Sequence, residues 1–137
     1  MEETPWAIKW SAALSMSHPE IDAEHRHFIE LINKLNSAIV YRKGKLEVEQ
    51  ILKQVLEDAI AHFTHEEQLF VMKKYPLRQE HSQIHAELVD RFRQAFMVIH
   101  ASSFDREWIE LGLSLKNQFL DHILNEDTKY IEYLRTE

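Results

Sequence analysis

The sequence predicts an all-α fold: an up-down-up-down antiparallel four-helix bundle with an extended N-terminal arm. Apolar residues recur about every 3.6 positions along four segments, and short connections separate these segments. Only two glycines and three prolines occur among 137 residues, which leaves little material for the tight turns of an all-β fold. The 45% of apolar residues suffices for one buried core. We expect a single domain, with the arm at residues 1–16 and the bundle at 17–137.

Capping and stop signals delimit the first two helices. Residues 17–20, Ser-His-Pro-Glu, fit a capping box with a proline in the first turn, so the first helix should begin there and end before Gly44. The second stripe starts at Val48. Its helix should stop near Tyr75, because the residue before Pro76 disfavours helical backbone.

The third and fourth helices are expected from similar patterns. The third stripe begins at His81 and fades at the two serines of residues 102–103. The fourth stripe begins at Trp108, and a stop is expected near Asn125. The arm lacks clear helical spacing, and we expect it to pack on the bundle in extended form. Its apolar residues are Trp6, Ile8, Trp10 and Leu14.

Charge and composition narrow the class of protein. The formal net charge of −7 argues against binding to a nucleic-acid backbone, and the basic run at residues 42–45 is better explained as a solvated loop. No stretch approaches the ~18 apolar residues of a membrane-spanning helix, and the N-terminal residues lack the pattern of a signal peptide. The absence of cysteine fits a reducing compartment. We expect a monomeric cytoplasmic protein that binds no nucleic acid and spans no membrane.

Seven histidine and carboxylate residues lie within the apolar stripes. They are His25, His62, Glu66, His81, His85, His122 and Asp127. The pairs at positions 62 and 66 and at 81 and 85 are spaced i,i+4, so each pair projects from one face of its helix. Antiparallel packing would bring all four helical regions to the same end of the bundle. Asp127 follows His122 by five residues, off the ideal face, so we expect the helix to break or bend near Asn125.

The types of donor in this set favour two metal ions and a small ligand. Without cysteine, a metal must be held by nitrogen and oxygen. Two octahedral ions offer about twelve positions, of which five imidazoles, two bridging carboxylates and one solvent-derived bridge fill about eleven. One vacancy remains, so a small ligand can bind at one metal only. Ferritin-like di-iron oxidases use more carboxylates, and fewer anionic donors stabilise high-valent iron less. We therefore interpret the site as one for reversible dioxygen binding.

These motifs resemble the hemerythrin family in its bacterial single-domain form. The resemblance covers the chain from Ile8 to Tyr130. The matching motifs are Ile-Asp-Ala-Glu-His at 21–25, His-Phe-x-x-Glu-Glu at 62–67, Tyr-Pro at 75–76, His-x-x-x-His at 81–85 and His-x-x-x-x-Asp at 122–127.

The resemblance implies a carrier of O2 with two non-heme iron ions as its cofactor. It implies that one iron is held by His81, His85 and His122. It implies that the other iron is held by His25 and His62 and that O2 binds there. Glu66 and Asp127 would bridge the two ions. This division agrees with the single vacancy expected from the donor set.

Two positions depart from the family pattern. Gln118 and Phe119 stand where the family often has Trp-Leu, and Glu24 replaces the glutamine of the usual Asp-x-Gln-His motif. Phe119 lies one turn before His122, so we expect it to face the O2 pocket, and O2 affinity and autoxidation rate do not carry over from the family. The predicted apolar lining of this pocket, which would keep water out, consists of Phe28, Phe63, Phe119 and Ile123. The alternative is that these four are simply core residues.

The remaining polar residues near the motifs receive simpler interpretations. His65 neighbours Glu66 and is a candidate for a hydrogen bond that supports one of the metal-binding side chains. Glu67 points about 100° away from Glu66 on an ideal helix, and we interpret it as solvated. Surface positions are predicted for His18, His27 and His100.

The leading hypothesis is a carrier, not an enzyme, that binds O2 for storage, transport or delivery, with an O2-consuming protein as its recipient. One alternative is an enzyme that reduces O2, peroxide or nitric oxide, although no proton relay is obvious in the sequence. Another is a sensor of O2 or redox state, which usually needs an attached output domain. A structural zinc bundle fits poorly, because such sites are closed and four-coordinate. Iron is favoured as the metal, and manganese suits the same donors.

Overall fold

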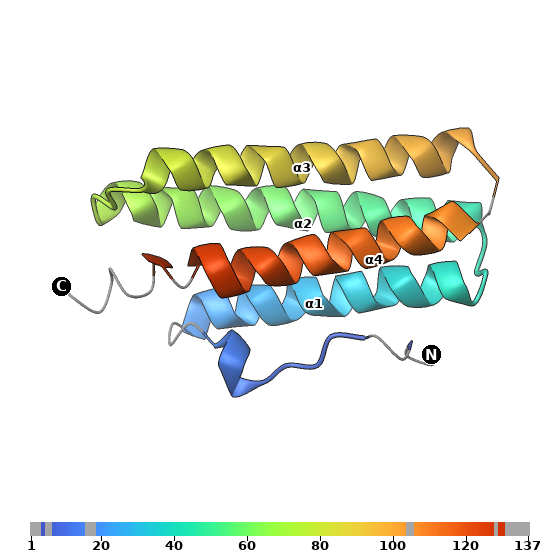
Figure 1. Ribbon diagram of the computed structural model, residues 1–137, viewed down its shortest axis with the longest axis horizontal. Helices are drawn as coiled ribbons and strands as arrows, with labels where there is room; N and C mark the ends of the chain where they lie inside the picture. The colour runs from blue at the N-terminus through green and yellow to red at the C-terminus, as the bar shows by residue number, and fades with distance from the viewer. Residues whose placement is uncertain (1–3, 5–6, 16–18, 104–105, 128, 131–137) are drawn as a thin grey trace.

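The computed structural model describes residues 4, 7–15, 19–103, 106–127 and 129–130. Its helices are α1 (Pro19–Val40), α2 (Lys45–Met72), α3 (Arg78–Ala101) and α4 (Arg106–Asp121). Consecutive helices run in opposite directions (Figure 1), so the predicted all-α, up-down-up-down bundle is confirmed. Within the described residues there is no strand, and no helix is long and apolar enough to cross a membrane.

The four helices form a ring around one core. α1 packs against α2 and α4, and α3 packs against the same two helices. The predicted apolar stripes face inward, because burying each large side chain contributes roughly 1.5–3 kcal/mol. Fully or almost fully buried members of these stripes are Ile32, Leu35, Leu52, Val55, Leu88, Phe92, Ile99 and Leu115.

Gly112 lets α4 approach α1 closely. The buried side chain of Asn36 on α1 donates from Nδ2 to the carbonyl of Gly112 at 3.3 Å, and to the carbonyl of Ile32 at 3.1 Å. A Cβ atom at position 112 would collide with Oδ1 of Asn36 and crowd the side chain of Ile39. The absence of a side chain at Gly112 is therefore part of how these two helices pack.

The helix ends agree with the stop signals in the sequence. α1 begins at Pro19, while the predicted capping residue Ser17 lies outside the described residues. α2 ends at Met72, just before Tyr75, and α3 ends at Ala101, before the two serines. Gly44 precedes α2 with a φ of +108°, a backbone conformation that glycine adopts without strain.

The N-terminal arm packs along α1, as predicted (Figure 1). Asn33 binds the backbone of Ile8 twice: its Oδ1 accepts from the Ile8 N–H, and its Nδ2 donates to the Ile8 carbonyl, both at 2.8 Å. Ile8 and Leu14 are buried, and the guanidinium of Arg26 lies 4.6 Å from the ring centre of Trp10. The arm is extended apart from one 3₁₀ turn, Ala12–Leu14, and Trp6 lies outside the described residues.

The chain continues from α4 into a π-helical segment, η2, which spans His122–Asp127. The break was expected near Asn125, and the change in winding instead begins at His122. A π-helix makes i→i+5 hydrogen bonds, and short segments of this kind occur frequently at functional sites.

Candidate metal centre

The structure brings all seven predicted site residues together at one end of the bundle. Antiparallel packing places the start of α1, the end of α2, the start of α3 and the end of α4 at that end (Figure 1). None of the seven is more than 5% exposed. They are His25 from α1, His62 and Glu66 from α2, His81 and His85 from α3, and His122 and Asp127 from η2.

Glu66 divides its two carboxylate oxygens between two groups of imidazoles. Its Oε1 lies 3.1 Å from Nε2 of His85 and 3.3 Å from Nε2 of His81. Its Oε2 lies 3.2 Å from Nε2 of His62. One carboxylate therefore faces α3 with one oxygen and its own helix with the other.

Asp127 divides its oxygens in the same way. Its Oδ1 lies 3.0 Å from Nε2 of His81 and 3.1 Å from Nε2 of His122. Its Oδ2 lies 3.4 Å from Nε2 of His25. Nε2 of His25 in turn lies 3.1 Å from Nε2 of His62. We name the resulting two groups the three-imidazole half (His81, His85 and His122) and the two-imidazole half (His25 and His62).

These separations suit donors arranged around common ions. Bonds of about 2.1 Å to a metal place neighbouring donor atoms about 3.0–3.4 Å apart in octahedral or tetrahedral geometry. The contacts just described run from 3.0 to 3.4 Å. Two sets of donors could each hold an ion, and within each set the ligand atoms all lie within 4.8 Å of one another. One set is the three-imidazole half with Glu66 and Asp127, and the other is the two-imidazole half with Glu66.

Many of these donor atoms have no hydrogen-bond partner. A buried polar atom is costly unless it is partnered, so its presence calls for an explanation. The seven side chains thus fit a metal-binding role better than that of a hydrogen-bonded core. Among the described residues, the unpartnered buried atoms of the cluster are Nδ1 of His25, Oε1 of Glu66, Nε2 of His81, Nε2 of His85, both ring nitrogens of His122 and both oxygens of Asp127.

Burial and contacts with histidines have opposite effects on the pKa values of Glu66 and Asp127. Burial and the charge of Asp127 act to raise the pKa of Glu66, yet contacts with the surrounding imidazoles hold that pKa well below its ordinary value. Burial likewise acts to raise the pKa of Asp127, but the charge of His122 and its close contact with Asp127 hold that pKa well below its ordinary value. Both carboxylates are therefore ionised and able to act as anionic donors.

Contacts with carboxylates raise the pKa values of two of the imidazoles. Burial acts to lower the pKa of His62, but contacts with Glu24 and Glu66 raise it to about 10. Burial also acts to lower the pKa of His81, but contacts with Asp127 and Glu66 raise it to about 9. In the metal-free protein these imidazoles carry protons that balance the carboxylates, and a metal ion must displace them.

Glu24 supports His62 from the neighbouring helix, which the sequence alone did not indicate. Its Oε1 lies 2.9 Å from Nδ1 of His62, and its Oε2 lies 2.7 Å from Nδ1 of His65. Burial acts to raise the pKa of Glu24, and the hydrogen bonds with both histidines lower it overall. His65 therefore contacts Glu24 and not Glu66, and it supports the site one step further out than predicted.

Glu67 supports His85 in an analogous way. Its Oε2 lies 3.3 Å from Nδ1 of His85, and 37% of its side chain is exposed. The prediction that Glu67 is simply solvated is therefore wrong. The rotation of about 100° that turns Glu67 away from Glu66 on an ideal helix points it at α3, which packs beside it.

Aromatic rings enclose both halves of the cluster. Phe119 lies 6.1 Å from the ring of His25 and 4.4 Å from Phe28, which puts both on the side of the two-imidazole half. Phe63 instead stacks on His85 at 4.0 Å with an interplanar angle of 6°. Ile123 is buried with them in the core.

A second group of aromatic residues closes the end of the bundle, a role that was not predicted for them from the sequence. Phe70 lies 4.7 Å from the ring of His81, and Tyr130 lies 4.4 Å from Phe70 in an edge-to-face arrangement. Tyr75 packs 5.1 Å from both Phe70 and Tyr130. All three are at most 2% exposed, so they shield the three-imidazole half from water.

Two of the remaining histidines lie at the surface, as predicted, and each contacts a carboxylate on another helix. Nε2 of His27 lies 2.6 Å from Oδ2 of Asp58, and Nδ1 of His100 lies 3.3 Å from Oε1 of Glu49. Their side chains are 57% and 68% exposed. His18 lies outside the described residues.

Comparisons with known proteins agree with this geometry. Residues 17–134 match the family model described as the hemerythrin HHE cation binding domain. The chain is 25% identical to a protein named bacteriohemerythrin from Stenotrophomonas maltophilia (strain R551-3) over 128 residues, which are 93% of this chain and 82% of that protein. A bacteriohemerythrin of Campylobacter jejuni subsp. jejuni serotype O:6 (strain 81116 / NCTC 11828) is 25% identical over 121 residues, or 88% of this chain and 90% of that protein.

Proposed function

Because the chain belongs to the hemerythrin family, we propose that it binds dioxygen reversibly at a centre of two iron ions and serves as an O2 carrier. The proposal rests on how the carboxylates of Glu66 and Asp127 are placed between the two groups of imidazoles. Each faces the three-imidazole half with one oxygen and the two-imidazole half with the other. Such an arrangement suits two bridging ligands between two ions.

The proposed ligand set follows from this division. One ion would be held by the three-imidazole half and the other by the two-imidazole half, with Glu66 and Asp127 shared. The second half supplies one imidazole fewer, so the open position for a ligand belongs there. When bound, the iron ions supply the electrons and the coordination position that a dioxygen carrier needs.

The protein's own residues would keep this binding reversible. The two buried carboxylates balance part of the metal charge, and the packed aromatic rings exclude water that would compete for the open position. Glu24 and Glu67 accept from Nδ1 of a histidine in each half, which fixes the ring orientation and directs Nε2 at the centre.

The decisive experiment combines metal analysis with an absorption spectrum taken on the reduced protein without O2, after admission of O2, and after its removal. We expect about two irons per chain and a visible charge-transfer band that appears with O2 and disappears without it. Zinc, or no metal, would contradict the di-iron centre. Rapid oxidation to a stable diferric protein would contradict the carrier.

A reductase of O2, peroxide or nitric oxide is the second candidate, and one observation favours it. The contacts from His62 to Glu24 and from Glu24 to His65 form a hydrogen-bonded chain from the buried centre to the surface. Reduction of these substrates consumes protons, and such a chain is able to deliver them. Sustained turnover with an external reductant, abolished in Glu24→Ala, would favour the reductase over the carrier.

A further inference from the structure

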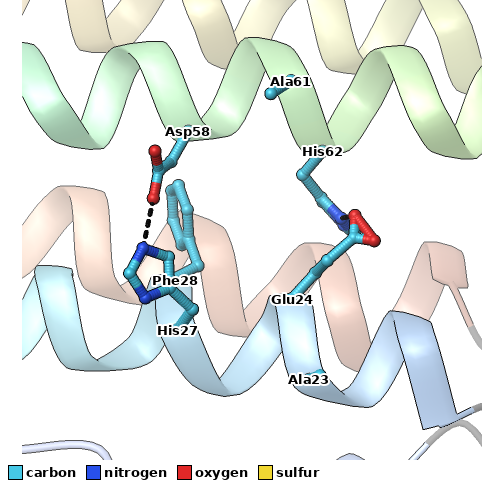
Figure 2. A pocket seen from close by; sticks show the side chains of 7 residues that line it. All are labelled: Ala23, Glu24, His27, Phe28, Asp58, Ala61 and His62. Atoms are coloured by element: carbon cyan, nitrogen blue, oxygen red, sulfur yellow. Dashed lines mark hydrogen bonds and ion pairs between the residues drawn. The ribbon is translucent and has the colours of Figure 1, made fainter.

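A cleft of about 390 Å³ opens between α1 and α2 beside the two-imidazole half. Figure 2 shows the side chains that form it, with Glu24 and His62 at one end and His27 and Asp58 at the other. Its lining consists of Ala23, Glu24, His27, Phe28, Asp58, Ala61 and His62.

The cleft reaches the half of the centre that has the open position under the proposed function. His62 is the member of the seven-residue cluster that lines it. A smaller cleft of about 170 Å³, between α3 and α4, instead reaches His122 in the three-imidazole half. The two clefts therefore lead from opposite sides of the bundle to different halves of the cluster.

Two small residues and one buried aromatic residue shape the cleft. Ala23 and Ala61 are exposed alanines on adjacent helices, and their short side chains leave the space open. Phe28 is 2% exposed and packs 4.4 Å from Phe119, which faces His25. His62 of the two-imidazole half thus meets the cleft directly, and the packed rings of Phe28 and Phe119 connect the cleft with His25, the other imidazole of that half.

Two contacts join α1 to α2 across the cleft: Glu24–His62 at one end and His27–Asp58 at the other. Nε2 of His27 on α1 lies 2.6 Å from Oδ2 of Asp58 on α2, drawn as the dashed line in Figure 2. The two side chains are 57% and 31% exposed. Exposed pairs of this kind contribute little to stability and their side chains reorient rapidly, so the contact is able to open without disturbing the bundle.

We propose that the cleft between α1 and α2 is the passage by which a small ligand such as dioxygen reaches the two-imidazole half, and that the His27–Asp58 contact is a latch across it. The proposal rests on the proposed function, which places the open position in that half. It adds the route of entry and the residues that control its rate.

Ligand association rates test the passage and the latch separately. The probes are O2 on the reduced protein and azide on the oxidised protein, both followed by stopped-flow absorption. Filling the cleft with Ala61→Leu should slow both probes by roughly tenfold, within the range that association rates vary among variants of one site. His27→Ala should accelerate both, because the latch is removed.

Matched variants on the other helices serve as controls. His100→Ala removes a comparable contact, His100 with Glu49, at the far end of α3 and should leave both rates unchanged. Gln118→Trp fills the cleft between α3 and α4 and should also have no effect. Unchanged rates in Ala61→Leu, or slower binding only in Gln118→Trp, would overturn the passage. Unchanged rates in His27→Ala would overturn the latch.

A second measurement keeps the proposal testable if a variant loses iron or the carrier function fails. Dissolved O2 enhances the nuclear relaxation of nearby methyl groups, and this effect can be measured in the metal-free protein because it needs no iron. The methyl groups of Ala23 and Ala61 should show a larger enhancement than that of Ala101, an exposed alanine at the end of α3. Equal enhancement at all three would overturn the passage. Azide binding without reversible O2 binding would overturn the proposed function alone.

Discussion

His122 and Asp127 are five residues apart, yet Nε2 of the first lies 3.1 Å from Oδ1 of the second. The π-helical winding of η2 produces this contact, because residues five apart share a face in a π-helix. In an α-helix the residue on that face would be Glu126, four positions after His122. The carboxylate thus enters the cluster through a local change in winding.

This winding gives a first prediction about the position of the carboxylate. Asp127→Ala should lower the metal content to one ion per chain or less, because it removes oxygens from both halves. Asp127→Ala still has a carboxylate at the i+4 position, Glu126, and shortening it in the double variant Glu126→Asp/Asp127→Ala should not recover the loss. The measurement is metal content after loading and gel filtration. Recovery to the wild-type content would show that the π-helical geometry is not required.

Much of the site could be predicted from the sequence because its members lie on regular helices. The i,i+4 pairs 62/66 and 81/85 follow directly from helical periodicity, and the antiparallel order places His25 at the same end. Asp127 was predicted despite its spacing, although the change in winding begins at His122 and not near Asn125.

The supporting residues could not be predicted in the same way, because their contacts cross between helices. Glu24 on α1 reaches His62 on α2, and Glu67 on α2 reaches His85 on α3. These contacts depend on how far each helix is rotated about its own axis, which periodicity gives only coarsely. For the same reason, the stacking of Phe63 on His85 could not be read from its position one residue after His62.

The pKa values of the imidazoles predict how pH affects the metal-free protein. The pKa of His62 is raised from 6.5 to about 10, and that of His81 from 6.5 to about 9. Their stabilising effect is therefore complete below about pH 6.5 and is lost as pH rises through 9 to 10. The lowered pKa values of Glu66 and Asp127 act in the opposite direction, since their effect is lost as the solution becomes acidic.

We therefore expect the Tm of the metal-free protein to be highest at mildly acidic pH and to fall between pH 6.5 and pH 10. The metal-loaded protein should not show this fall, because bound metal already requires neutral imidazoles. Thermal unfolding followed by circular dichroism at several pH values tests both statements. A metal-free Tm that rises with pH above 6.5 would contradict them.

Gly112 gives a prediction about packing that is independent of the metal. Gly112→Ala should destabilise the protein by about 1–3 kcal/mol, the usual cost of forcing extra atoms into a packed interior. The collision is with Oδ1 of Asn36, so Asn36→Ala should partly relieve it in the double variant. Chemical denaturation of the two single variants and the double variant gives the coupling between the sites. Additive losses would show that Asn36 is not the group that Gly112 accommodates.

Glu24 gives the last prediction, because among the described residues it is the one carboxylate that contacts both His62 and His65. Removing a carboxylate that orients a metal-binding histidine typically costs 10–100-fold in metal affinity, so Glu24→Ala should weaken metal binding by roughly that factor. Glu24→Gln keeps an oxygen that accepts from Nδ1 of His62 and should retain most of the affinity. It removes the negative charge, however, and should therefore raise the reduction potential of the di-iron centre.

Matched variants of Glu67 show whether the two halves respond separately. Glu67 is more exposed than Glu24, and its contact with His85 is longer, 3.3 Å against 2.9 Å. Glu67→Ala should therefore weaken metal binding less than Glu24→Ala does. Competition with a chromophoric chelator measures the affinities, and a redox titration measures the potentials. Equal metal affinities in Glu24→Ala and the unsubstituted protein would mean that packing alone orients His62. A loss of metal affinity in Glu24→Gln as large as that in Glu24→Ala would mean that the charge of Glu24, and not its hydrogen bond, is responsible.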